Sequence, residues 1–174
     1  MTSHRLADPA GIEDLLLFRL NRLIGLSGSL VTRICEGRFG VTRREWSVLA
    51  VAAREESMAW GDLRDRCELD ESRVSRAVTS LVAKGLAEKT TAKSRQVSVR
   101  LTPKGRKLYE ELFPIAQAIN ADLIAVLDAR TAEILDKTLD ALHARAKEQF
   151  SQSDQPKAGR LRGGSRAAPS TSRE

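Results

Sequence analysis

The 174-residue sequence predicts a mainly α-helical chain with one small β-hairpin. Two observations carry this prediction. Apolar residues recur at helical spacing through most of the chain, whereas the segment QVSVRLT, residues 96–102, alternates apolar and polar residues as a strand does. Gly85 also stands between the most regular helical pattern and this strand region, where a left-handed helix end is expected.

Residues 70–84, DESRVSRAVTSLVAK, predict a helix with one packing face and several polar faces. The packing face is expected to hold Val74, Val78, Leu81 and Val82. Short hydroxyls and arginines fall on the other faces: Ser72, Arg73, Ser75, Arg76 and Thr79. Asp70 precedes the helix, where its carboxylate can cap the first backbone N–H groups. A two-stranded wing is expected to follow, with Val97, Val99 and Leu101 turned inward.

Positive charge is concentrated in the same part of the chain. The net charge is +6, but residues 72–105 hold eight Lys or Arg against the single acid Glu88. Such a surface favours a polyanionic partner, because cations that dock on phosphates release condensed counterions. A solvated basic face is the alternative, and charge alone leaves the two about equal. The basic helix followed by a wing favours nucleic acid.

The segments before this helix also have helical patterns. Residues 12–36 carry apolar side chains on more than one side, which calls for more than one neighbour. Thr42 and Glu45 have the spacing of a capping box, at the start of a helix that runs to about Arg54. Residues 59–67 predict a short helix. Two short helices joined by a tight connection have the layout of a helix-turn-helix.

Two further helices are expected after the wing. Thr102 and Pro103 mark the first start, Pro114 is expected to bend that helix or split it in two, and Asp128 can cap the second. The apolar faces of the first helix and the last two indicate packing against a second copy of the chain, which would present two recognition helices to successive major grooves. From Ser151 the chain is rich in Gly, Pro, Ser and Arg and is expected to be disordered.

Several protein classes are disfavoured by the sequence. It has no apolar run of membrane-spanning length and no apolar stretch near its start, so we expect a cytoplasmic protein without a membrane partner. Cys35 and Cys67 lack a nearby ligand cluster and are expected to be reduced, without a zinc site. No phosphate loop, metal-ligand cluster or nucleophile–base spacing is found, so we expect neither catalytic residues, cofactor nor metal, and no enzyme.

The order and wording of these segments resemble the MarR family of winged-helix transcription regulators, over residues 12–148. LDESRVSRAVTSLVAKGLAEK is similar to the family's recognition helix and first wing strand, and RQVSVRLTPKG to its second wing strand and next helix start. The resemblance implies a homodimer on a palindromic operator in double-stranded DNA. Residues 1–40 and 102–150 would then form the dimerisation helices, 41–101 the winged helix-turn-helix DNA-binding region, and 151–174 a disordered basic tail.

The resemblance also implies which residues contact DNA. Five match recognition-helix residues that face the major groove: Ser72, Arg73, Ser75, Arg76 and Thr79. Arginine there can bridge O6 and N7 of guanine. Arg95 matches a wing-tip arginine that enters the minor groove in relatives. Lys93 replaces a common aspartate in a shorter loop, so this tip is expected to hold phosphate more strongly. A phosphate contact or a solvated side chain is the alternative for each arginine.

Members of the family often respond to small aromatic carboxylates, including pyridine carboxylates. The matching positions here are Ser29, Arg43 and Trp46. Arg43 can pair with a carboxylate while Trp46 stacks on a ring, and the alternative is that Trp46 lies in the core and Arg43 on the surface. The resemblance implies a ligand-responsive repressor of a catabolic or stress operon. A sequence-tolerant architectural DNA-binding protein is the alternative function.

Overall fold

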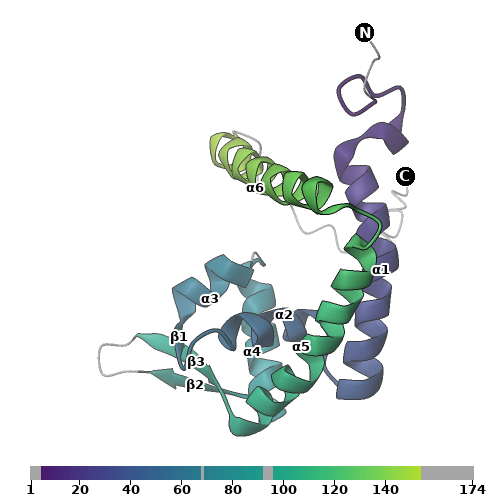
Figure 1. The fold of residues 1–174 in the computed structure, drawn as a ribbon. Helices are drawn as coiled ribbons and strands as arrows, with labels where there is room; N and C mark the ends of the chain where they lie inside the picture. Colours follow the sequence, from purple (N-terminus) through teal and green to yellow (C-terminus); the bar gives the residue numbers. More distant parts are fainter. Residues whose placement is uncertain (1–4, 68, 92–95, 154–174) are drawn as a thin grey trace, which may run out of the picture. The chain divides into compact units, whose positions relative to one another are not determined.

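The computed structural model describes residues 5–67, 69–91 and 96–153 (Figure 1). It is mainly helical with one small antiparallel sheet, which confirms the predicted fold class. The chain divides after Leu123 into two compact units, and α6 belongs to the second. In chain order the elements are η1 (Ile12–Asp14), α1 (Leu16–Phe39), α2 (Arg43–Ala52), β1 (Met58–Ala59), α3 (Trp60–Cys67), α4 (Glu71–Ala83), β2 (Ala87–Thr91), β3 (Val97–Leu101), α5 (Pro103–Ile124) and α6 (Ala129–Gln152).

The first predicted helix is divided and longer than expected. A single 3₁₀ turn, η1, ends at Leu15, whose backbone is extended, and α1 then continues to Phe39. Gly40 ends α1 with φ of 64°, a left-handed conformation that glycine adopts without a Cβ clash. The apolar side of α1 stays largely uncovered, with Leu17 74% and Leu26 79% exposed. This uncovered side agrees with the expectation that the helix requires a further neighbour.

Helices α2, α3 and α4 surround the core of the reading head, which we define as residues 41–101. Its fully buried side chains include Val48, Leu49, Leu63, Val74, Val78, Leu81 and Val99. The predicted packing face of α4 is confirmed at three of its four positions, but Val82 is 41% exposed. Successive helical residues are about 100° apart, so Val82 lies about 90° from the centre of the buried face. Ala77 lies on that face instead and is buried.

Both ends of α4 are fixed by the residues that the sequence indicates. The Asp70 carboxylate accepts a hydrogen bond from the backbone N–H of Arg73, at 2.9 Å, as an N-cap does. At the other end Gly85 has φ of 68°, and the backbone N–H of Leu86 donates to the carbonyl of Leu81 at 2.9 Å. The predicted cap and helix stop are therefore confirmed.

The wing consists of β2 and β3, which pair antiparallel with Lys89 opposite Val99. A third strand, β1, pairs with the other edge of β3 and places Met58 opposite Val99, so that the strand order is β1-β3-β2. The sequence does not predict β1, because a two-residue strand has no periodicity of its own. Met58 and Val99 are both fully buried, and β1 thereby anchors the base of the wing to the core.

Helix α5 begins where the sequence predicts. The Thr102 hydroxyl accepts a hydrogen bond from the Gly105 N–H at 3.0 Å and donates to the Gly85 carbonyl at 2.7 Å. The expectation that Pro114 splits this helix is wrong, since α5 is continuous from Pro103 to Ile124. Proline removes one backbone N–H from the helix. The hydrogen bonds on either side, together with buried Leu112, are sufficient to continue it.

The second unit contains α6, which is capped by Asp128 as predicted: its carboxylate accepts the Thr131 N–H at 2.7 Å. None of its described residues is buried. Its large apolar residues Ile134, Leu135, Leu139 and Leu142 are all exposed. The expectation of disorder from Ser151 is wrong for Ser151 and Gln152, which continue α6 because backbone hydrogen bonding extends the helix. The remainder of that prediction, from 154 on, lies outside the described residues.

No single helix in the described part of the chain combines the length and apolar character needed to cross a membrane. Only α5 and α6 taken together, as a bent pair, meet that test by length and composition.

We predict that Gly105→Ala destabilises the protein by about 1–3 kcal/mol, as overpacking does. A Cβ at Gly105 would lie 1.9 Å from the carbonyl oxygen of Leu86, so the start of α5 would have to move. Urea unfolding measures the loss. Gly37→Ala in α1 is the matched control, because nothing lies within 4 Å of an added Cβ there, and it should be neutral or stabilising. Equal unfolding midpoints for the two variants would contradict the prediction.

Candidate nucleic-acid interface

The predicted DNA-contacting residues of α4 lie away from its packed face. Arg73, Arg76 and Thr79 are exposed, and Ser72 and Ser75 are partly buried. The predicted wing-tip residues Lys93 and Arg95 lie outside the described residues. The described structure therefore brings together the part of the predicted interface that α4 carries.

A network of hydrogen bonds orients the first turn of α4. Nε of Arg73 lies 2.8 Å from one carboxylate oxygen of Asp70, and the Ser72 hydroxyl donates to the other at 2.6 Å. The Ser72 hydroxyl and the capped Arg73 N–H hold the pKa of the Asp70 carboxyl below its usual range. Nε of Arg76 donates to the Ser72 carbonyl at 3.1 Å. Both guanidinium groups thus have defined positions while remaining exposed.

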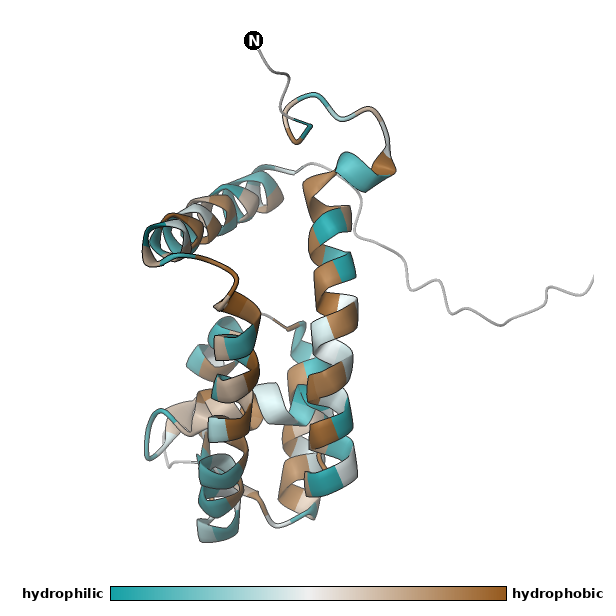
Figure 2. Cartoon of the chain, turned by 45° about the vertical axis from the view of Figure 1, so that its right-hand side comes forward, coloured by the Kyte–Doolittle hydropathy of each residue, from teal (hydrophilic) through white to brown (hydrophobic). Residues whose placement is uncertain are grey.

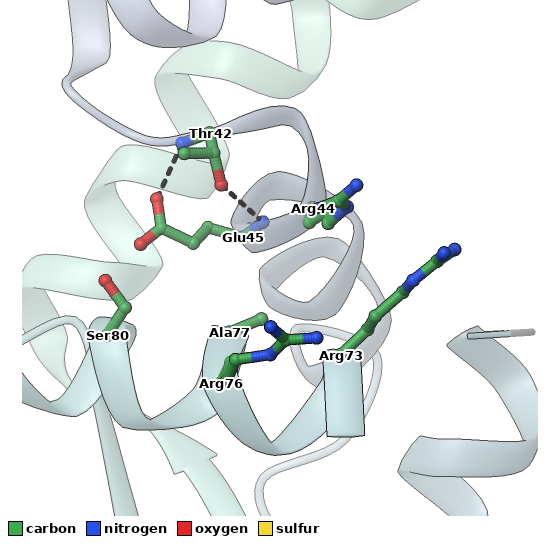
Figure 3. Close-up of a pocket in the computed structure, with 7 residues that line it drawn as sticks. All are labelled: Thr42, Arg44, Glu45, Arg73, Arg76, Ala77 and Ser80. Atoms are coloured by element: carbon green, nitrogen blue, oxygen red, sulfur yellow. Dashed lines mark hydrogen bonds between the residues drawn. The ribbon is translucent and has the colours of Figure 1, made fainter. Parts of the chain in front are cut away.

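A pocket of about 230 Å³ lies between α2 and α4. It is lined by Thr42, Arg44, Glu45, Arg73, Arg76, Ala77 and Ser80 (Figure 3). Sequence reasoning missed Arg44, because it precedes Arg73 by 29 positions and no local pattern links the two. The available signal was its place in the first turn of a capped helix, where side chains stand beside unpaired backbone N–H groups.

The Glu45 carboxylate is buried at the inner end of this region, with the residue only 3% exposed. It accepts hydrogen bonds from Nζ of Lys84 at 2.7 and 2.9 Å and from the Thr42 N–H at 2.6 Å. Burial by itself would raise the pKa of this carboxyl. The hydrogen bonds from Lys84, Ser80 and Thr42 outweigh burial and hold the pKa below its ordinary value of 4.5. The predicted capping box is confirmed, and it is joined to an ion pair with α4's C-cap residue.

The base of the wing carries cations with defined partners. Nζ of Lys89 lies 4.7 Å from the centroid of the Trp60 ring, a cation–π contact between β2 and α3. Arg100 pairs with Glu88 across the two strands at 2.6 Å. Part of the positive charge counted in the sequence is therefore used within the reading head, and the basic surface centres on the arginines of α2 and α4.

The three residues predicted to bind an effector do not line one pocket. Arg43 lines a second pocket of about 530 Å³ together with Thr32, Glu36, Thr42, Arg44, Ser47 and Leu69. Its guanidinium lies against Gly28 of α1, where an added Cβ would be 2.5 Å from Nη1. Ser29 is exposed and donates to the Gly25 carbonyl, at 2.5 Å. Trp46 stacks on Tyr109 of α5 with ring centroids 5.9 Å apart.

Neither cysteine has the environment of a reactive thiol. Both are free. Burial and the nearby Glu36 raise the pKa of the fully buried Cys35, and burial raises the pKa of Cys67 to about 11. Among residues 5–67, 69–91 and 96–153, no three or more His, Cys, Asp or Glu side chains come together in a way that could hold a metal ion.

A helix pair, an exposed basic third helix and a two-stranded wing define a winged helix-turn-helix protein. The chain belongs to the MarR family, whose model matches residues 39–95 and so spans most of the reading head. This family and fold are those of DNA-binding transcription regulators. No curated protein matches the chain in sequence.

Solved structures of other regulators have the same fold. A MarR family transcriptional regulator from Silicibacter pomeroyi DSS-3 is 29% identical, with a TM-score of 0.66, over 76% of this chain and 98% of that one. A MarR/EmrR family regulator from Acinetobacter sp. ADP1 is 22% identical, with a TM-score of 0.73, over 79% and 99%. BpsR of Bordetella bronchiseptica, whose DNA binding is regulated by 6-hydroxynicotinic acid, is 21% identical, with a TM-score of 0.60, over 72% and 98%.

We predict that Glu45→Gln destabilises the protein by about 1–3 kcal/mol at neutral pH, because Lys84 then loses its charged partner. The folded-state pKa of Glu45 is lowered, so its stabilising effect is present above the ordinary pKa of 4.5 and disappears as the pH falls through the lowered value. The stability difference between wild type and variant should therefore shrink below about pH 4.5.

Urea unfolding at several pH values measures this difference. Glu110→Gln, a change on the exposed part of α5, is the matched control and should leave stability nearly unchanged throughout. A difference for Glu45→Gln that stays constant from neutral to acid pH would contradict the prediction.

Proposed function

We propose that this protein is a dimeric, sequence-specific transcription repressor whose hold on a palindromic DNA operator is released by a small aromatic carboxylate. The observation that carries the proposal is the exposed face of α4. It presents two guanidinium groups and several hydroxyls on a helix that is capped, packed on one side and followed by a wing. Regulators of this class insert such a helix into the major groove.

Base contacts are proposed for Arg73 and Arg76, and phosphate or base-edge contacts for Ser72, Ser75 and Thr79. A guanidinium can bridge the two acceptors of guanine, while a hydroxyl bonds to either group. For the wing tip, minor-groove contact by Arg95 and a phosphate contact by Lys93 remain proposals that the described residues do not address.

The proposed dimer body is formed by residues 1–40 and 102–150. Figure 2 shows hydrophobic residues along much of α1. The exposed ones include Leu17, Leu23, Ile24, Leu26 and Leu30, and α6 exposes a comparable set within its own unit. Contiguous apolar surface of this extent is costly in water and is typical of an interface. The two-fold symmetry of a dimer would place recognition helices about 34–36 Å apart, one turn of DNA.

The effector is proposed to bind through Arg43. The regulation of BpsR by 6-hydroxynicotinic acid supports an aromatic carboxylate as the class of ligand. The pocket beside Arg43 has space for such a molecule, and Arg43 can form a bidentate pair with its carboxylate. That pocket shares Thr42 and Arg44 with the pocket beside α4. A ligand there would bias α2, and through it α4, toward a form that does not fit DNA.

Selection of bound fragments from genomic DNA by the purified protein tests the proposal. A short palindrome should be recovered, with affinity at least roughly 10³-fold above that for competitor DNA at moderate salt. We further predict that Arg76→Ala weakens operator binding by about 1–3 kcal/mol and relaxes selection at one base pair per half-site. Arg33→Ala, the same change on the exposed side of α1, is the control.

Fragments without a shared motif would overturn the repressor and support the alternative, an architectural protein that coats DNA. The concentration of positive charge in residues 72–105 favours that second function. Unrelaxed selection by Arg76→Ala would contradict only the base contact of Arg76.

We predict that Arg43→Ala keeps operator affinity but abolishes release by 6-hydroxynicotinic acid, used as the probe. The ligand's carboxylate would lose its ionic partner, whereas α4 and the wing would be unchanged. Fluorescence anisotropy of labelled operator, titrated with the acid, measures release. Ser29→Ala is a milder control, because its hydroxyl already bonds to Gly25. Equal release from wild type and Arg43→Ala would contradict the proposed effector site.

A further inference from the structure

We propose that the pocket between α2 and α4 seats one phosphate group of the DNA backbone, with Arg44 as its main ligand. This inference rests on the proposed function and extends it. It assigns DNA contact to α2, a helix outside the recognition helix and the wing, and it reassigns the α2-facing side of α4 to the backbone.

The pocket holds more positive charge than its surroundings neutralise. Arg73 is paired with Asp70, and the carboxylate of Glu45 is paired with Lys84. Arg76 donates only to the neutral carbonyl and hydroxyl of Ser72.

Arg44 is exposed and has no hydrogen-bond or ion-pair partner among the described residues. Two guanidinium groups, those of Arg44 and Arg76, are thus left without an anionic partner in one pocket. Their mutual repulsion is relieved by a bound anion.

The geometry of the pocket separates these cations from its acid. Figure 3 shows Arg44, Arg73 and Arg76 on one side of the pocket, projecting from α2 and α4, and the carboxylate of Glu45 on the other. The capping box holds that carboxylate on the Thr42 N–H, while Lys84 bonds both of its oxygens. The acid is therefore fully occupied, and an anion beside the arginines does not meet a free carboxylate.

The position on α4 selects the DNA backbone rather than a base. Helical geometry places Arg73, Arg76 and Ser80 toward the α2 side of α4, whereas Ser75 and Thr79 lie toward the other side. A helix in the major groove has its outer face against the bases and its flanks near the strands. The flank beside α2 therefore meets a phosphate, for which fork-shaped guanidinium donors are suited.

A phosphate group can reach this pocket from DNA or as a free ion. A free ion would have to be held by side chains that are largely exposed, where ionic contacts are screened. A DNA phosphate is delivered by the same duplex that α4 binds, so its local concentration is high. We therefore commit to the DNA source and make the free ion an outcome of the test.

The first measurement compares the salt dependence of DNA binding by full-length wild type, Arg44→Ala and Arg33→Ala. Each variant loses one charge, and only Arg44 lines the pocket. Arg44→Ala should weaken operator and competitor DNA by the same factor, because a phosphate contact carries no sequence information. Its log–log salt slope should be flatter by about 0.9 for each seat lost, whereas Arg33→Ala should match wild type.

The second measurement replaces single operator phosphates by neutral methylphosphonates. One position per half-site should weaken binding by wild type and Arg33→Ala and have little further effect on Arg44→Ala. Circular dichroism and melting temperatures verify that all three proteins are folded.

Equal salt slopes for Arg44→Ala and Arg33→Ala would overturn the inference, as would additive effects of the variant and every methylphosphonate. A third arm titrates DNA-free protein with inorganic phosphate. Saturable binding lost only in Arg44→Ala, without a sensitive methylphosphonate, would overturn the DNA source in favour of a free ion. A flattened slope on random DNA, in a protein that selects no palindrome, would support the seat while the repressor proposal fails.

Discussion

The arrangement of the reading head depends on one buried carboxylate. Glu45 bonds to the start of its own helix through Thr42 and to Lys84, the C-cap residue of α4. Nζ of Lys84 also donates to the Gly40 carbonyl at the end of α1, at 2.8 Å. A single ionic cluster therefore fixes the ends of three helices. A buried charge is tolerated only when its partners satisfy it, so these helix ends cannot separate without leaving the carboxylate unpaired.

This constraint determines where the functional arginines meet. With the start of α2 fixed against α4, Arg44 lies beside Arg73 and Arg76 in one pocket, and the neighbouring Arg43 reaches Gly28 of α1 in another. Both pockets include Thr42, the N-cap of α2. Contacts proposed for DNA and for the effector thus converge on one capped helix start, which gives the two ligands a short physical route by which each can oppose the other.

The apolar surfaces of the long helices serve a different purpose from the core of the reading head. The core is satisfied within residues 41–101 and the parts of α1 and α5 that cover it, through Cys35, Leu112 and the stack of Trp46 on Tyr109. Farther along α1, large apolar side chains remain exposed. A stable reading head combined with uncovered helices is the division expected of a chain that completes its packing through a second copy.

Local chemistry determined the secondary structure, so the sequence alone predicted most of it. The caps at Thr42, Asp70 and Asp128 and the left-handed stop at Gly85 each act within a few residues of their own helix. The sequence likewise predicted the exposed arginines of α4. Only the tertiary structure decided the Glu45–Lys84 pair, the strand β1, the contact of Arg43 with Gly28 and the place of Arg44 beside Arg76. These contacts join residues far apart in the chain, and hydrophobic periodicity specifies which face of a helix is buried but not which neighbour it meets.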